Sequence, residues 1–198
     1  LLADWQLGGG AAWSFKLTNL LLHAVDAALL LALLRRHAVA RGAAIVAAIW
    51  FAVHPLASET VNFVSARSEA LLLLGLLLAA NGHAAWRAGA RWGSVGVLVG
   101  TIVACGSKET GVVAPALLLG TEVLLLRGPW RAAIGAQWRP ALVRMLPAVL
   151  VAVGYLVVRK ELLGQATATL VGRVAGDPTI GATRDLATQL ATMGLLLP

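Results

Sequence analysis

Two carboxylates and an arginine lie close together in the segment FAVHPLASETVNFVSARSEALLLL, between two apolar runs. Glu59, Arg67 and Glu69 form a mixed-charge set, and His54 precedes Pro55, which ends a helix because proline has no backbone donor. Charged groups beside a bilayer core are costly, which favours a function for them. The carboxylates could perform acid or base catalysis, or the arginine could hold a phosphate that a glutamate orients. The alternatives are a structural salt bridge and a helix-ending histidine.

A second polar cluster lies in the sequence GSKETG, residues 106–111, between two other apolar runs. The Lys108 ammonium and the free backbone donors of this turn could bind a phosphate, with Glu109 beside them. Alternatively, Lys108 only extends its amine to the membrane interface.

A third set occupies the first apolar segment, where Lys16, Asn19, His23 and Asp26 share one helical stripe. The stripe therefore faces protein or water, either as a hydrogen-bonded contact with a neighbouring helix or as part of a site. Asp26 lies deeper and is expected to brace His23. His23, His54 and the carboxylates lack zinc-ligand spacing, so no protein-ligated metal and no cofactor are predicted, and a need for a divalent metal stays open.

The elements that must position these residues belong to a membrane protein. Hydrophobic residues make up 59% of the chain before glycine is counted, only 13% of residues are charged, and the mean hydropathy is +0.82. The chain has no initiator methionine and stops inside an apolar run, so we expect residues 1–198 to be part of one multi-pass membrane domain. The predicted fold class is an all-α transmembrane bundle of about seven apolar segments: 14–34, 40–56, 68–85, 94–110, 111–126, 141–158 and 185–198.

Arginine is distributed unevenly between the two sets of gaps. One set holds nine arginines and one nearby acid, Glu122, whereas the other holds seven basic and seven acidic residues. The nine are Arg35, Arg36, Arg41, Arg87, Arg91, Arg127, Arg131, Arg139 and Arg144. The positive-inside rule makes the arginine-rich side cytoplasmic, so every unusual polar cluster is predicted to lie on the extracytoplasmic side.

Several other classes of function find little support in the sequence. The net charge of +7 comes from arginines in short loops without interleaved aromatics, so nucleic acid is not a predicted partner. The single cysteine, Cys105, excludes an intrachain disulfide and is expected to be a buried hydrophobe. The chain carries no nucleophile elbow, P-loop or dinucleotide fingerprint. The gap 159–184, rich in Gly, Thr and Ala, is predicted to be an exposed loop.

These clusters, in this order, resemble the membrane half of the TMTC proteins, the transmembrane O-mannosyltransferases with tetratricopeptide repeats, and of their bacterial relatives. SFKLTNLLLH at 14–23 is similar to the family's FHxxNxxLH segment. AAIWFAVHPLASETVNFVSARSEALLLL at 47–74 resembles its AALLFAxHPxxxExVxxxxxRxExL stretch. ACGSKETGVVAPALLL at 104–119 resembles its Lys-Glu turn, and GYLVVRKELLG and ATRDLATQLATMGLLLP resemble later segments.

The resemblance implies a GT-C type glycosyltransferase fold in a bacterial inner membrane, with a sugar donated by polyprenyl or dolichyl phosphate at the extracytoplasmic face. It also implies a first transmembrane helix and an acidic pair in a first catalytic loop before residue 1, and a repeat domain after residue 198. Asp4 is assigned no role. Lys16 departs from the family, which often carries histidine there.

The resulting prediction is a glycosyltransferase whose partners are the lipid bilayer, a lipid-linked sugar donor and a protein or glycan acceptor hydroxyl. Arg67 and Lys108 would bind the donor phosphate and favour its release. The catalytic candidates within this chain are Glu59, Glu69 and His54, and the supporting residues are Asn19, His23, Asp26 and Glu109. The alternatives are a polytopic transporter or flippase and a non-catalytic membrane scaffold.

Overall fold

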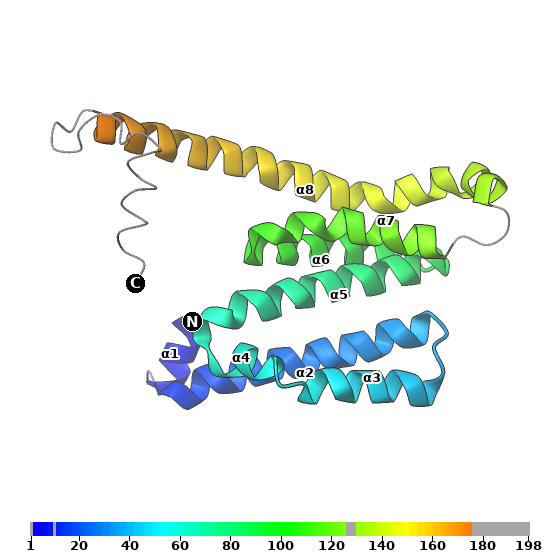
Figure 1. The fold of residues 1–198 in the computed structure, drawn as a ribbon, viewed down its shortest axis with the longest axis horizontal. Helices are drawn as coiled ribbons and strands as arrows, with labels where there is room; N and C mark the ends of the chain where they lie inside the picture. Colours follow the sequence, from blue (N-terminus) through cyan, green and yellow to red (C-terminus); the bar gives the residue numbers. More distant parts are fainter. Residues whose placement is uncertain (1, 10, 126–129, 176–198) are drawn as a thin grey trace, which may run out of the picture. The chain divides into compact units, whose positions relative to one another are not determined.

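The computed structural model describes residues 2–9, 11–125 and 130–175, and every regular element within those ranges is a helix. The elements are α1 (Leu2–Gly8), α2 (Ala12–Arg36), α3 (Arg41–Val53), α4 (Ala57–Asn62), the 3-10 helix η1 (Val64–Ala66), α5 (Arg67–Arg87), α6 (Gly93–Ser107), the 3-10 helix η2 (Glu109–Val113), α7 (Ala114–Leu124) and α8 (Trp130–Ala175) (Figure 1). The chain divides into two compact units, Leu1–Tyr155 and Leu156–Pro198. The described part of the second unit is the last portion of α8.

Three helical stretches in the described part of the chain are long and apolar enough to cross a membrane: Ala12–Arg36, Val64–Arg87 and Trp138–Leu162. Each has 24 or 25 residues, above the roughly 20 that a bilayer core requires. α3 and α6 are apolar but have only 13 and 15 residues. The structure therefore indicates a membrane protein, as the composition predicts, without confirming about seven spans.

The exposure pattern of α2 is the reverse of that in a water-soluble helix. Its buried residues are polar, namely Ser14, Asn19, His23 and Asp26. Its exposed residues include the apolar side chains of Leu17, Leu20, Leu21 and Val25. An apolar surface around a polar interior suits a lipid environment, because lipid solvates leucine and excludes ionisable groups. The predicted stripe of Asn19, His23 and Asp26 is thus a buried face, whereas Lys16 lies exposed.

Most of the predicted apolar segments correspond to observed helices. Segments 14–34, 40–56, 68–85 and 94–110 match α2, α3, α5 and α6, and 111–126 is divided between η2 and α7. The segment 185–198 lies outside the described residues.

The prediction of loops on both sides of segment 141–158 was wrong. α8 begins at Trp130, inside the expected gap 127–140, and continues to Ala175, inside the expected loop 159–184. The sequence RKELLGQATATLVGRVA at 159–175 contains no proline and many good helix formers, so scattered Gly and Thr cost too little to end the helix. Residues 176–184 lie outside the described residues.

α5 and α6 pack against each other along a seam of small residues. A Cβ added at Gly75 would lie 2.4 Å from the backbone nitrogen of Ala104, and one added at Gly100 would lie 2.3 Å from that of Ala79. Gly82 meets the backbone of Gly93 in the same way. The two backbones therefore touch, as in the small-residue interfaces of membrane helices, where packing replaces the hydrophobic effect. α5 and α6 therefore form an antiparallel pair in direct backbone contact.

α2 and α5 run in the same direction. The Arg67 Nε donates to Asn19 Oδ1, and the Asn81 Nδ2 donates to the Leu29 carbonyl, so contacts advance along both helices together. The first turn of α5, which holds Arg67, is called the Arg67 end, and its last turn, which holds Arg87, the Arg87 end. Arg35 and Arg36 lie in the last turn of α2, beside the Arg87 end of α5, as the predicted sidedness requires.

Candidate functional site

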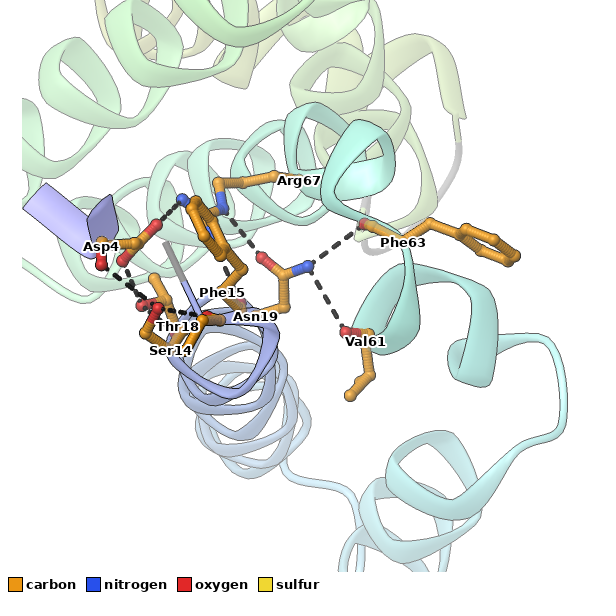
Figure 2. Close-up of polar contacts among 9 residues, drawn as sticks. Asp4, Ser14, Phe15, Thr18, Asn19, Val61, Phe63 and Arg67 are labelled. Carbon is orange, nitrogen blue, oxygen red and sulfur yellow. Dashed lines mark hydrogen bonds and ion pairs between the residues drawn. The ribbon is translucent and has the colours of Figure 1, made fainter. Parts of the chain in front are cut away.

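Arg67 opens α5 and connects three segments through its guanidinium group (Figure 2). Its Nη1 donates to Asp4 Oδ2 of α1. Its Nε donates to Asn19 Oδ1 at 2.8 Å, and its Nη2 donates to the Phe15 carbonyl at 3.2 Å, both in α2. The side chain is only 11% exposed, so these bonds form largely away from water, where they are stronger. Arg67 therefore fixes α1 and α2 against the start of α5.

Asn19 extends this arrangement to the turn after α4. Its side chain is fully buried, and its Nδ2 donates to the carbonyls of Val61 at 3.4 Å and Phe63 at 3.2 Å (Figure 2). Its Oδ1 accepts from Arg67, so the amide uses both ends in one orientation. Asn19 is thus a structural link between α2 and the connection from α4 to α5.

Asp4 completes this group, and the sequence analysis missed it. The Thr18 hydroxyl donates to Asp4 Oδ1 at 2.7 Å, and the Ser14 hydroxyl donates to the Asp4 carbonyl at 3.2 Å. The hydrogen bond from Thr18 and then the contact with the Arg67 guanidinium hold the pKa of Asp4 below its ordinary value. Asp4, Thr18, Asn19 and Arg67 are called the Arg67 cluster. One sequence feature could have predicted this contact: Asp4 is an acid in the same predicted extracytoplasmic set of charges as Arg67 and lies close to the start of the polar stripe.

A separate ion pair lies two residues further along α5. Lys108, between α6 and η2, donates from its Nζ to Glu69 Oε1, and the two side chains are 39% and 48% exposed. Arg67 and Lys108 therefore lie at the same end of α5 but bind different carboxylates. Glu59 lies exposed on α4 and Glu109 lies exposed at the start of η2, so neither forms part of the buried Arg67 cluster.

An apolar pocket of about 520 Å³ lies among α2, α3, α4 and α5. Its polar lining is contributed by His23, Asp26, His54, Thr60 and Glu69. Most of the remaining lining is aromatic or aliphatic: Trp50, Phe51, Leu56, Leu72, Leu73 and Leu76. Pockets of this size and composition are typical of small-molecule sites. Glu69 thus belongs both to this pocket and to the exposed pair with Lys108.

The two histidines of the pocket are positioned by α3. The His23 Nε2–H donates to the Ala52 carbonyl at 3.1 Å, which leaves Nδ1 of the neutral ring as an acceptor, and the ring lies 5.0 Å from Phe51. His54 ends α3, as the following proline predicts, and its Nδ1 accepts from the Leu56 backbone at 3.3 Å. The Trp50 ring lies edge-on to it at 5.8 Å.

Asp26 does not brace His23, contrary to the expectation from the sequence. Asp26 is 1% exposed, and its Oδ1 has no hydrogen-bond partner, whereas His23 is held by the Ala52 carbonyl instead. An unsatisfied buried carboxyl oxygen is expensive, because it loses water without gaining a donor. Asp26 is therefore a buried residue of the pocket lining whose Oδ1 accepts no hydrogen bond from the described residues.

The Arg87 end of α5 carries a cluster that the sequence analysis did not anticipate. Glu122 of α7 accepts from His83 Nε2 at 2.9 Å, from Arg144 Nε at 2.7 Å and from Arg87 Nη1. The Glu122 side chain is 4% exposed. These four residues, called the Glu122 cluster, tie α5, α7 and α8 together. One sequence feature could have predicted this cluster: Glu122 is the one acid near the nine arginines of the predicted cytoplasmic side.

No group of three or more His, Cys, Asp or Glu side chains suited to a metal ion occurs among the described residues. Comparison with protein-family models, with curated proteins and with solved structures finds no match to this chain. Fold and site define the described part of the chain as a helical membrane protein with an apolar pocket, partly lined by polar side chains, among α2, α3, α4 and α5.

Proposed function

We propose that this chain is the membrane domain of a glycosyltransferase with a GT-C-like fold and multiple spans in a bacterial inner membrane. It transfers a sugar from a polyprenyl or dolichyl phosphate to an acceptor hydroxyl on the extracytoplasmic face. The observation that carries the proposal is the exposed pair of Lys108 and Glu69 at an apolar pocket that Glu69 itself lines. The segments around both residues resemble the TMTC proteins, and both lie opposite the arginine-rich end of α2 and α5.

Lys108 is the phosphate-binding residue in this mechanism. When the bond between the sugar C1 and the phosphate oxygen breaks, negative charge develops on the phosphate, and a fixed ammonium stabilises it. Without a donor, Glu69 holds the ammonium at the pocket. Because this pair is exposed, it can open at small cost when a phosphate replaces the carboxylate.

Arg67 has a different role from the one that its spacing suggests. It already donates to Asp4, Asn19 and the Phe15 carbonyl and keeps two of its five N–H groups for other acceptors. We assign it to holding α1 and the start of α2 against α5, with any phosphate contact secondary to that of Lys108. The base that deprotonates the acceptor hydroxyl is expected from the acidic loop that the resemblance places before residue 1.

A transporter is the second candidate, because Asp26 lies deep in α2 with an unpartnered oxygen. Ionisable groups of this kind line ion and substrate paths. A covalent product separates the two functions, since a transporter moves its substrate unchanged.

The test is sugar transfer in membranes from a radiolabelled polyprenyl-phosphate hexose. Lys108→Met should lower the transfer rate about 100-fold, the order of magnitude for loss of one group that stabilises transition-state charge. The matched control is Lys16→Met, since Lys16 is an exposed lysine near the start of α2 and lies outside the pair that joins Lys108 to Glu69. Equal rates for wild type and Lys108→Met would contradict the assignment. Label that crosses the membrane without a covalent product would favour the transporter.

A further inference from the structure

The polar lining of the pocket is suited to a ligand that donates a hydrogen bond rather than to an anion. Two carboxylic residues, Asp26 and Glu69, line it, and neither lysine nor arginine does. The Glu69 carboxylate is neutralised at the rim by Lys108, which leaves Asp26 as the only acid in the pocket without a cation. An anionic group that entered to the depth of Asp26 would meet an acidic residue and no nearby cation to balance its charge.

No donor among the described residues reaches the Oδ1 acceptor of Asp26. The residue is 1% exposed, its Oδ1 is unpartnered, and it lines the pocket. Buried polar atoms are satisfied in the great majority of cases, so an orphan oxygen beside a pocket points to a donor that arrives with a ligand.

The rest of the lining determines what must carry that donor. Trp50, Phe51, Leu72, Leu73 and Leu76 surround the space, so the body of the ligand must be apolar. A volume of about 520 Å³ holds a substantial part of a hydrocarbon chain. Many flanking side chains of α2 and α3, such as Val25 and Ile49, are exposed as in a lipid-facing surface, so a membrane-dissolved ligand is the natural occupant.

We propose that this pocket binds a membrane-dissolved alcohol, whose hydroxyl donates to Oδ1 of Asp26 and whose hydrocarbon chain packs against Leu72, Leu73 and Leu76. A hydroxyl satisfies the orphan oxygen at a much lower desolvation cost than an ammonium group. This inference concerns the binding of an alcohol, goes beyond the proposed function and stands on the pocket alone.

The experiment is photolabelling of the protein in nanodiscs with a long-chain alcohol that carries a diazirine in its chain, with labelled residues located by mass spectrometry. Label should appear within residues 72–76, and dodecanol should compete for it while dodecanoate does not. Asp26→Leu should lower the labelling about ten-fold, the upper end of what loss of a single hydrogen bond is expected to cost. Asp26→Asn keeps an acceptor oxygen and should stay within about three-fold of wild type.

The matched control is Asn81→Leu. Asn81 is also buried with an unpartnered Oδ1, but it does not line the pocket, so its loss should leave labelling unchanged. Thermal unfolding of each variant in the same nanodiscs shows whether it is folded. Equal labelling of wild type and folded Asp26→Leu, equal competition by dodecanoate, or stronger competition by dodecylamine than by dodecanol would overturn the proposal.

The sugar-transfer assay separates this result from the proposed function. Labelling that obeys these expectations without any sugar transfer would leave the alcohol site standing and remove the transferase. Sugar transfer to other acceptors without specific labelling would leave the transferase standing and remove the alcohol site.

Discussion

The two ends of α5 use similar charged groups in opposite ways. At the Arg87 end, Glu122 is 4% exposed and accepts hydrogen bonds from three cationic or ring donors. At the Arg67 end, Glu69 is 48% exposed, pairs with Lys108 and lines a pocket. A carboxylate that is buried with all its donors in place fixes helices, whereas an exposed carboxylate with one flexible partner can exchange that partner for a ligand.

The Arg67 end itself combines both arrangements. Arg67 with Asp4 and Asn19 is largely buried and joins α1, α2 and α5 (Figure 2). The pair of Glu69 and Lys108 begins two residues further along α5, on a different face of the helix, and is far more exposed. Charge alone therefore does not mark a functional residue. Its burial and the presence of a neighbouring pocket determine whether it can bind a ligand.

Removing the charge of Glu122 should have the largest effect on stability. Glu122→Gln leaves two arginines facing each other with one neutral acceptor, so the free energy of unfolding should fall by about 3–5 kcal/mol. Thermal unfolding in detergent measures this. Glu59→Gln, at an exposed position of α4, is the control and should leave the unfolding temperature unchanged. A small effect at Glu122 would remove the contrast between the two ends.

Acidification should weaken the Arg67 cluster by an intermediate amount. The pKa of Asp4 is lower in the folded protein than its ordinary value of 3.8, so its contribution to stability is present above pH 3.8. That contribution is lost as the pH falls through the lower folded value, because the protonated carboxyl no longer attracts Arg67. The unfolding temperatures of wild type and Asp4→Asn should therefore differ at pH 6 and converge towards pH 2. A difference that stays constant over this range would show that Asp4 does not act through its charge.

Breaking the exposed pair should have the smallest effect on stability. Lys108→Met should change the free energy of unfolding by less than about 1 kcal/mol, because water screens an ion pair that is more than a third exposed. Chemical or thermal unfolding checks this beside the transfer assay. A loss as large as that of Glu122→Gln would make Lys108 a structural residue and place both ends of α5 in the same class.

The sequence predicted those features that depend on local periodicity. The stripe of Asn19, His23 and Asp26 follows from helical spacing, and the end of α3 at His54 follows from the proline after it. Length and hydropathy likewise located most of the helices, although they did not decide how many cross the membrane.

The sequence did not predict contacts that depend on how distant helices pack. The partner of Arg67 is 63 positions away in Asp4, and Glu122 meets His83 across 39 positions. No local pattern distinguishes these partners from the nearer carboxylates Glu59 and Glu69. The continuous α8 also differs from the prediction, because glycine and threonine are weak loop signals where no proline interrupts the chain, as in 159–175.

The proposed function depends most directly on which side of the membrane each end of α5 occupies. In a Cys105→Ala background, Glu59→Cys near the pocket and Arg91→Cys between α5 and α6 place single exposed thiols at opposite ends of α5. Labelling of intact bacterial cells with a membrane-impermeant maleimide should modify the thiol at position 59, and should modify that at 91 only after the membrane is permeabilised. Labelling of position 91 in intact cells, with position 59 protected, would contradict an extracytoplasmic site.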